Sequence, residues 1–213
     1  AAPRRPAETP PRLLLIGDSL AAHLWGAIAE ARPDLSVLQA TAAGCTPAPA
    51  LPQDLRSSPL CKEMMNLVYD ELLPSAPPER VVFSARWRPQ HLPGLLAAIQ
   101  RMQTAGVDKI TVLGPTVEYQ GALPKLLARD SLLHIESAPY QVNPQQWEIS
   151  AKMAQVLQGI PGVTYVDLLP ILCEGGPEQG CKTRVEGVPI QFDYGHYTVP
   201  GARYIATRIA RMF

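Results

Sequence analysis

Short apolar runs alternate with segments of helical periodicity along the chain. The first run, Leu13–Ile16, is continuously apolar, as in a parallel strand that is buried on both faces. Apolar residues then recur at helical spacing from Leu20 to Ala31. The same rhythm predicts further strands at Leu35–Gln39, Arg80–Ala85, Lys109–Leu113 and Gly162–Val166, and further helices at Lys62–Leu73, Leu95–Gln103, Pro124–Leu133, Pro144–Leu157 and from Val199 to Phe213.

Five strands that alternate with helices predict a parallel sheet covered by helices on both faces. We therefore expect an α/β fold, built as a single three-layer α/β/α domain around a five-stranded parallel sheet. Residues 1–11 are rich in proline and are interpreted as the end of a linker, and residues 12–213 as the domain. Apart from the short helix at Pro124–Leu133, the segment 115–143 is predicted to be irregular, and 170–192 is predicted to be a loop.

Composition and charge exclude several classes of protein. The chain has 213 residues, 46% of them apolar, which is enough for a core that needs neither a metal nor an oligomer. Its 19 basic and 19 acidic side chains cancel, which argues against nucleic acid or acidic lipid as the main partner. No apolar run approaches the ~18 residues of a membrane span. Because nucleotide-binding and metal-binding motifs are also absent, no cofactor and no metal are predicted.

Four cysteines fall into two pairs that bracket loops. Cys45 and Cys61 flank a proline-rich loop, and Cys173 and Cys181 flank a loop rich in glycine and proline. Neither pair has the spacing of a zinc ribbon or a thioredoxin motif. The pattern favours two local disulfides, Cys45–Cys61 and Cys173–Cys181, formed in an oxidising compartment. Four cysteines allow three connectivities, and four free buried thiols are the alternative.

A serine follows the first predicted strand, in the sequence Gly17-Asp18-Ser19. In an open parallel sheet, ligands bind beyond the carboxyl ends of the strands. A serine that begins a helix there holds its Oγ in the open, and the free N–H groups of the helix can stabilise an oxyanion. The alternative is an ordinary helix N-cap serine. Asp18 is expected to brace the turn through hydrogen bonds to backbone N–H groups.

An aspartate and a histidine precede the last helix, in Asp193-Tyr-Gly-His196. An aspartate three residues before a histidine can accept the imidazole Nδ1–H, which leaves Nε2 free to take a proton from a serine. This spacing alone is common in surface pairs. Its combination with Gly-Asp-Ser in an α/β chain is more specific, and together they predict a Ser19-His196-Asp193 triad.

These motifs resemble those of the SGNH, or GDSL-type, hydrolases, a superfamily of serine esterases and acyltransferases with a flavodoxin-like fold. The resemblance implies that Ser19 is the nucleophile, His196 the general base and Asp193 its orienting acid. Gly44, in Ala-Ala-Gly-Cys after the second strand, matches the glycine of the oxyanion hole. The superfamily's third donor is an asparagine after the third strand. This chain has Ser-Ala-Arg-Trp there, which makes Arg86 a candidate oxyanion donor.

Three further features resemble one branch of this superfamily: the Ala-Arg-Trp sequence, the Gly-Cys-x-Pro turn and the cysteine pair before Phe-Asp-x-x-His. This resemblance extends over about residues 12–213. The branch consists of the C-terminal SGNH domains fused to family-3 membrane acyltransferases, which O-acetylate bacterial surface polysaccharides such as the lipopolysaccharide O-antigen. The resemblance implies a periplasmic or extracytoplasmic domain, tethered to a membrane acyltransferase domain absent from this chain. Its partners would be an acetyl donor and a polysaccharide acceptor.

Other candidates near the edge of the sheet each have a plainer interpretation. Arg86 could equally form a stacking contact or a salt bridge. Trp87 is a candidate wall for a sugar ring, or a core tryptophan. His23 could line the cleft above Ser19 or simply pack, and Tyr194 could touch a sugar or pack its loop. Two other histidines, His91 and His134, are expected to be solvated.

Three functions are compatible with these residues. The leading hypothesis is an O-acetyltransferase that works through an acyl-serine. An acetylesterase would use the same triad with water as the acceptor, and the two differ only in water exclusion and acceptor binding. A carbohydrate-binding module without catalytic activity is the third. The presence of all three triad residues argues against that module.

Overall fold

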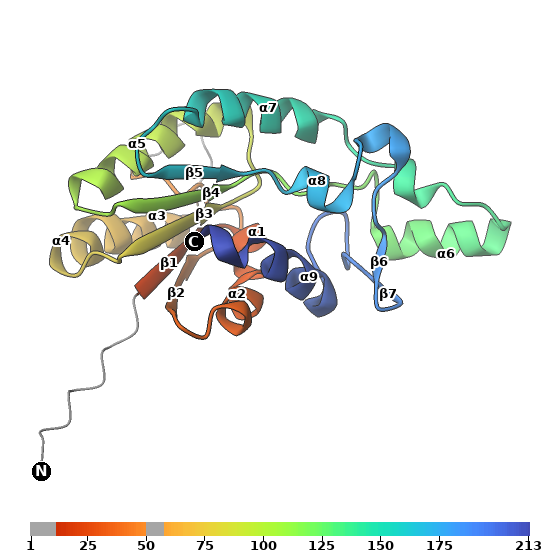
Figure 1. Cartoon of the computed structure of the whole chain (residues 1–213), viewed down its shortest axis with the longest axis horizontal. Coiled ribbons are helices and arrows are strands. Elements are labelled where there is room, and N and C mark those ends of the chain that lie inside the picture. Colours follow the sequence, from red (N-terminus) through yellow and green to blue (C-terminus); the bar gives the residue numbers. More distant parts are fainter. Residues whose placement is uncertain (1–11, 50–57) are drawn as a thin grey trace, which may run out of the picture.

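A five-stranded parallel sheet forms the centre of the computed structural model, which describes residues 12–49 and 58–213 (Figure 1). The spatial order of its strands is β2-β1-β3-β4-β5. Their bounds are Arg12–Gly17 for β1, Ser36–Thr41 for β2, Arg80–Ser84 for β3, Lys109–Leu113 for β4 and Val163–Val166 for β5. The predicted strands and the α/β class are therefore confirmed. The linker predicted at residues 1–11 lies outside the described residues.

Strand β1 shows why the first apolar run is continuous. Leu13 and Leu15 pack into the core on one face of the sheet, and Leu14 and Ile16 pack into the core on the other. All four side chains are at most 2% exposed. A strand flanked by two parallel neighbours and covered on both faces has no solvent-facing side, so alternation with polar residues disappears.

Helices cover both faces of the sheet, as predicted. Those on the β1–Leu13 face are α1 (Ser19–Ala22), α2 (Trp25–Ala31), α8 (Leu169–Leu172) and α9 (Val199–Ile209). Those on the opposite face are α3 (Pro59–Asn66), α4 (Leu73–Ser75), α5 (Leu92–Thr104) and α7 (Gln145–Leu157). Helix α6 (Leu123–Leu133) lies apart from the sheet, beyond its carboxyl edge (Figure 1). None of these helices is long and apolar enough to cross a membrane, within the ranges that the structure describes.

Several segments differ in detail from the prediction. The helix expected at Lys62–Leu73 is split by a π-helical turn, η1 (Leu67–Leu72). The expected loop 170–192 begins within α8 and contains the 3₁₀ turn η4 (Pro177–Gln179) and a short antiparallel hairpin of β6 (Arg184–Val185) and β7 (Val188–Pro189). Three further 3₁₀ turns are η2 (Pro89–His91), η3 (Ala138–Tyr140) and η5 (Ala210–Met212).

Both predicted disulfides are present. Cys45 is bonded to Cys61, which ties the segment after β2 to helix α3. Cys173 is bonded to Cys181, which ties the end of α8 to the segment before the hairpin. All four cysteines are therefore paired, and the alternative of four free thiols is wrong.

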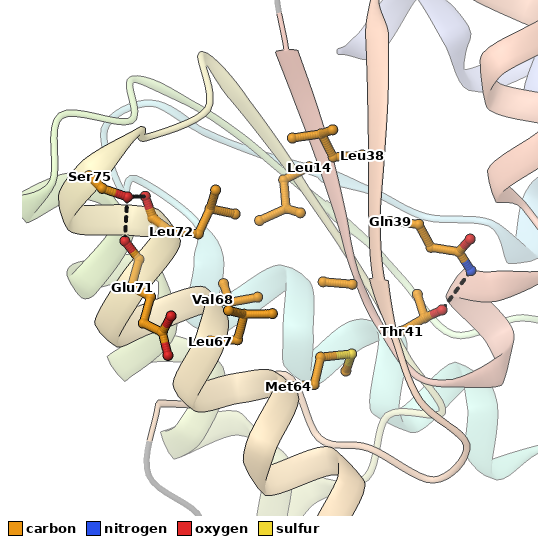
Figure 2. A pocket seen from close by; sticks show the side chains of 11 residues that line it. Leu14, Leu38, Gln39, Thr41, Met64, Leu67, Val68, Glu71, Leu72 and Ser75 are labelled. Carbon is orange, nitrogen blue, oxygen red and sulfur yellow. Dashed lines mark hydrogen bonds between the residues drawn. The ribbon is translucent and has the colours of Figure 1, made fainter.

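A hollow of about 770 Å³ lies between the edge strand β2 and the helical segment α3–η1. Figure 2 shows aliphatic side chains on both sides of it, including Leu14 and Leu38 from the sheet and Val68 and Leu72 from η1. None of the predicted site residues lines this hollow. The candidate chemistry lies in a smaller cleft, at the carboxyl edge of the sheet.

Candidate active site

The turn after β1 places Ser19 at the first position of helix α1. A Cβ atom on Gly17 would lie 1.7 Å from the carbonyl oxygen of Ser84, so only glycine lets β1 approach the end of β3 this closely. Asp18 caps α1 by accepting the N–H of Leu20 at 2.7 Å and also accepts the N–H of Arg86 at 2.8 Å. The predicted bracing role of Asp18 is confirmed, and its carboxylate joins the ends of β1 and β3. Burial raises the pKa of Asp18, and these two hydrogen bonds oppose the rise.

Ser19, His196 and Asp193 form one continuous line of hydrogen bonds. The Nε2 atom of His196 lies 2.8 Å from Ser19 Oγ, and its Nδ1 lies 2.7 Å from Asp193 Oδ2. The other carboxylate oxygen of Asp193 accepts the N–H groups of Gly195 at 2.9 Å and His196 at 2.8 Å. The Asp-x-x-His spacing therefore closes a tight turn that fixes the aspartate and the imidazole relative to each other. Two segments from opposite ends of the chain meet at this point.

Asp193 is held in its ionised form. Partial burial disfavours the carboxylate, but the hydrogen bonds from two backbone N–H groups and from the imidazole outweigh it and hold the pKa of Asp193 below its ordinary value. An ionised aspartate against Nδ1 requires that nitrogen to carry a proton, which leaves the Nε2 lone pair for the serine hydroxyl. The arrangement can thus act as a nucleophile with its general base.

His23 packs behind the catalytic histidine. Its Nδ1 accepts the N–H of Tyr197 at 3.2 Å, and its ring meets those of His196 and Tyr197. Burial, and the proximity of His196, lower the pKa of His23 to about 3. His23 is not among the residues that line the cleft above Ser19. The structure therefore corrects its prediction as a substrate contact: His23 is a neutral packing residue.

Two residues of the cleft, Ser19 and Gly44, have backbone N–H groups that could bind an oxyanion. Gly44 follows β2 with φ at +66°, a left-handed conformation that favours glycine, and it is exposed. Ser19 and Gly44 line one cleft of about 300 Å³, together with His196 and Tyr194. Neither the Ser19 N–H nor the Gly44 N–H donates to a backbone acceptor among residues 12–49 and 58–213. Neither donor is therefore occupied by another backbone group in the described part of the chain.

The side chain of Arg86 is committed to an ion pair. Its Nε and Nη2 atoms bond the two carboxylate oxygens of Glu118 at 2.5 and 2.7 Å, and the guanidinium lies over the ring of Tyr194 at 4.8 Å. Glu118 raises the pKa of Arg86 further above its ordinary value. The structure favours the salt-bridge interpretation over that of an oxyanion donor. The prediction that Trp87 stacks against a sugar is wrong, because its side chain is 1% exposed and its Nε1–H donates to the Leu113 carbonyl at 2.7 Å.

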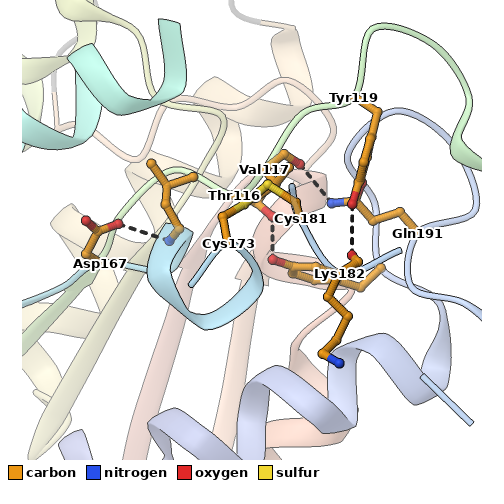
Figure 3. Close-up of a disulfide and its surroundings, with 10 residues drawn as sticks. Thr116, Val117, Tyr119, Asp167, Cys173, Cys181, Lys182 and Gln191 are labelled. Carbon is orange, nitrogen blue, oxygen red and sulfur yellow. Dashed lines mark hydrogen bonds between the residues drawn. A yellow bond between two sulfur atoms is a disulfide. The ribbon is translucent and has the colours of Figure 1, made fainter. Parts of the chain in front are cut away.

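A segment between β4 and α6 supports the triad turn. The N–H groups of Tyr119 and Leu123 donate to the carbonyls of Tyr194 at 2.8 Å and Asp193 at 3.0 Å. Gln191 donates its side-chain amide to the Val117 carbonyl at 2.8 Å. Figure 3 shows this bond beside the Cys173–Cys181 disulfide, with the Tyr119 hydroxyl bonded to the Lys182 carbonyl. Hydrogen bonds thus connect the triad turn to this segment, and connect the segment to the residue that follows Cys181 of the disulfide.

Three polar residues of the cleft were missed by the sequence analysis: Thr46, Arg88 and His91. His91 was expected to be solvated, yet its ring is partly buried and its Nδ1 has no hydrogen-bond partner among the described residues. Burial lowers the pKa of His91, and Arg88 adds to the effect. The available signal was position alone, because Thr46 follows β2, and Arg88 and His91 follow β3, at the carboxyl edge of the sheet. His134, in contrast, is exposed as expected.

Comparisons with known proteins agree with this fold. The family model described as "SGNH domain (fused to AT3 domains)" matches residues 2–211. The chain superposes on the periplasmic domain of a lipopolysaccharide acetyltransferase from Salmonella ser. Paratyphi A with a TM-score of 0.79 and 23% identity, covering 96% of this chain and 84% of that one. It superposes on the C-terminal catalytic domain of peptidoglycan O-acetyltransferase A from Streptococcus pneumoniae with a TM-score of 0.53 and 14% identity, covering 95% and 91%. No curated protein matches the chain.

Proposed function

Because the chain belongs to the family of SGNH domains fused to AT3 domains, we propose that it is the catalytic domain of a serine-dependent O-acetyltransferase acting on a bacterial surface polysaccharide. Both solved structures that it resembles are described as domains of acetyltransferases, one for lipopolysaccharide and one for peptidoglycan. The observation that carries the proposal is the unbroken hydrogen-bonded line from Asp193 through His196 to Ser19. A carbohydrate-binding module without catalytic activity would not require these hydrogen bonds.

In the first half of the proposed reaction, the acetyl group moves to the enzyme. His196 Nε2 takes the hydroxyl proton as Ser19 Oγ attacks the acetyl carbonyl carbon, and Asp193 stabilises the resulting imidazolium. The N–H groups of Ser19 and Gly44 bind the oxyanion of the tetrahedral intermediate. When the intermediate collapses, His196 returns the proton to the leaving oxygen of the donor. The product is an acetyl ester of Ser19.

The second half runs the same chemistry toward the acceptor. A sugar hydroxyl gives its proton to His196 and attacks the acetyl carbonyl of the ester, and the same two N–H groups hold the oxyanion. Ser19 Oγ leaves and recovers the proton from His196, so the free enzyme is regenerated and the sugar carries the acetyl group. If water took the place of the sugar hydroxyl, the reaction would be that of an esterase.

Family membership also supports a partner and a location. The fusion named in the family description supports a membrane AT3 domain as the partner that brings the acetyl donor to Ser19. Two disulfides are typical of proteins that fold in an oxidising compartment. The Salmonella domain is described as periplasmic. We therefore propose that this domain is periplasmic or otherwise extracytoplasmic.

The test follows acetyl groups from p-nitrophenyl acetate. Ser19→Ala and His196→Ala should each lower turnover by at least about 1000-fold, and the double variant should be little worse, because the residues act as a unit. Mass spectrometry of the quenched native protein should find one acetyl group on the Ser19 peptide. Asp193→Asn should retain more activity than either, since it keeps both the nucleophile and the base.

The matched control is Ser75→Ala, an exposed serine at the end of α4 that takes no part in the site and should keep native turnover. If Ser19→Ala also kept native turnover, the assignment of the nucleophile would be wrong. Adding the polysaccharide then separates the two reactions. Acetyl groups that appear on the polymer indicate a transferase, and release of acetate alone indicates an esterase.

A further inference from the structure

A second hollow lies directly beside the cleft of the triad. It has a volume of about 450 Å³ and shares two residues with the cleft, Arg86 and Tyr194. These two side chains are stacked on one another and form the wall between the two spaces. The other residues that line the hollow are Glu118, Tyr119, Gln120, Gly121, Asn143 and Pro144. Ser19 and His196 line the cleft on the other side of this wall.

Two extended segments that are hydrogen-bonded to each other form the floor of the hollow. Tyr119 and Val142 form an antiparallel bridge, flanked by hydrogen bonds from the Gln120 N–H to the Gln141 carbonyl at 2.8 Å and from the Asn143 N–H to the Glu118 carbonyl at 2.7 Å. The bridge residues face the core, with side chains 3% and 4% exposed. In extended chains successive side chains alternate between faces, so Gln120 and Asn143 project from the opposite face, into the hollow.

Polar groups in this hollow have unused hydrogen-bonding capacity. The Gln120 amide nitrogen donates to the Val142 carbonyl at 3.1 Å, and its side-chain oxygen has no protein partner in the described part of the chain. The Asn143 side-chain oxygen accepts the Gln145 N–H at 3.1 Å, which leaves its amide nitrogen to donate. The charge of Arg86 is neutralised by Glu118. Amides that donate and accept without net charge suit the hydroxyl groups of a neutral sugar.

We propose that this hollow is an acceptor subsite, which binds a neutral sugar residue adjacent to the one whose hydroxyl is acetylated. The proposal rests on the acetyltransferase function proposed above. The volume lies within the range of about 300–1,000 Å³ that is usual for small-ligand sites. A polysaccharide that crosses the Arg86–Tyr194 wall would present one residue to Ser19 while its neighbour occupies the hollow. The subsite would thus make the enzyme prefer a polymer to a single sugar.

Occlusion of the hollow tests this directly. Gln120→Cys introduces a single reactive thiol, because all four native cysteines are in disulfides, and a bulky maleimide attached there would fill the hollow. The acceptor is the surface polysaccharide of the producing organism, freed of its acetyl groups by mild alkali, and the donor is p-nitrophenyl acetate. The measured quantity is the ratio of acetyl transferred to the polymer to acetate released. We expect the label to lower this ratio at least about tenfold.

The control is Gln100→Cys with the same label, on the exposed face of helix α5, which should keep the native ratio. A second variant, Gln120→Ala with Asn143→Ala, should raise the KM for the polymer and abolish the preference for polymer over its component monosaccharides. The subsite alone is overturned if the labelled protein transfers acetyl groups to the polymer as well as the control does. A chain that forms no acetyl-Ser19 overturns the proposed function itself. If acetyl-Ser19 forms but only water can cleave it, the protein is an esterase, and both the subsite and the proposed transferase function are overturned.

Discussion

The Arg86–Glu118 ion pair should contribute more to stability than most pairs near a protein surface. Glu118 has a side chain that is only 5% exposed, whereas that of Arg86 is 38% exposed. Arg86→Ala would leave a carboxylate nearly out of water without its bidentate partner. No second cation bonds this carboxylate within residues 12–49 and 58–213, so nothing replaces Arg86 there.

The magnitude follows from the burial of the two groups. Removing one partner of a fully buried pair costs about 3–5 kcal/mol. Because Arg86 is partly exposed, water screens the pair, and we expect a loss of about 2–3 kcal/mol in the free energy of unfolding. For a protein of this length that corresponds to a fall of about 4–12 °C in Tm. Adding Glu118→Gln to Arg86→Ala removes the unpaired charge and should recover part of the loss.

Urea unfolding followed by circular dichroism, with the disulfides intact, measures these differences. The matched control is Arg203→Ala, which removes a pair with Glu30 of the same bidentate geometry, at 2.7 and 2.9 Å, whose side chains are both more than half exposed. That variant should lose much less stability than Arg86→Ala, because water screens a pair that is exposed on both sides. The reasoning is refuted if Arg86→Ala is no more destabilising than Arg203→Ala, or if the second substitution at Glu118 recovers nothing.

Three further predictions concern single features of the fold. Folding lowers the pKa of His23 from 6.5 to about 3, so the unfolded chain binds the proton first as the pH falls below 6.5. Between pH 7.5 and 4.5 the native protein should therefore lose up to about 2.7 kcal/mol of stability beyond what the His23→Gln variant loses. Urea titrations at both pH values measure the two losses, and equal losses in the native protein and the variant would contradict this prediction. Gly17→Ala should unfold or fail to express as soluble protein, because its Cβ would overlap the Ser84 carbonyl. A melting curve like that of the native protein would contradict this, since it would show that β1 and β3 can separate at this point. Replacing Cys45 and Cys61 by alanine should cost about 3 kcal/mol through the entropy of the opened loop, which calorimetry at matched redox conditions would measure.

The sheet and the triad could be predicted from sequence because each depends on local signals. A strand buried on both faces must be continuously apolar, which marked Leu13–Ile16 without any knowledge of its neighbours. Ser19 and the Asp193–His196 turn were found because short turns fix the relative positions of nearby residues. Their meeting then followed from the rule that parallel strands end at one edge.

The remaining features depend on contacts between distant segments, which leave no periodic signal. Nothing near Arg86 in the sequence marks Glu118 as its partner, since the two residues come from different loops. The bridge between Tyr119 and Val142 is too short to produce an alternating pattern, so the segment 115–143 was predicted to be irregular. His91 was expected in solvent because its burial results from the packing of the cleft. Such interactions are decided by tertiary structure and not by local propensity.

The separation of Ser19 from its base, 177 residues along the chain, also affects when activity can arise. A chain that emerges from its N-terminal side at ~5–20 residues per second presents the serine about 10–35 s before the histidine. During that interval the hydroxyl has no base and is as unreactive as any other serine. Helix α9 follows the histidine and packs on α2, so the same packing that joins the two ends of the chain brings His196 near Ser19. Ester turnover is therefore a stringent reporter of finished folding, and a partly emerged chain is protected from acylating itself.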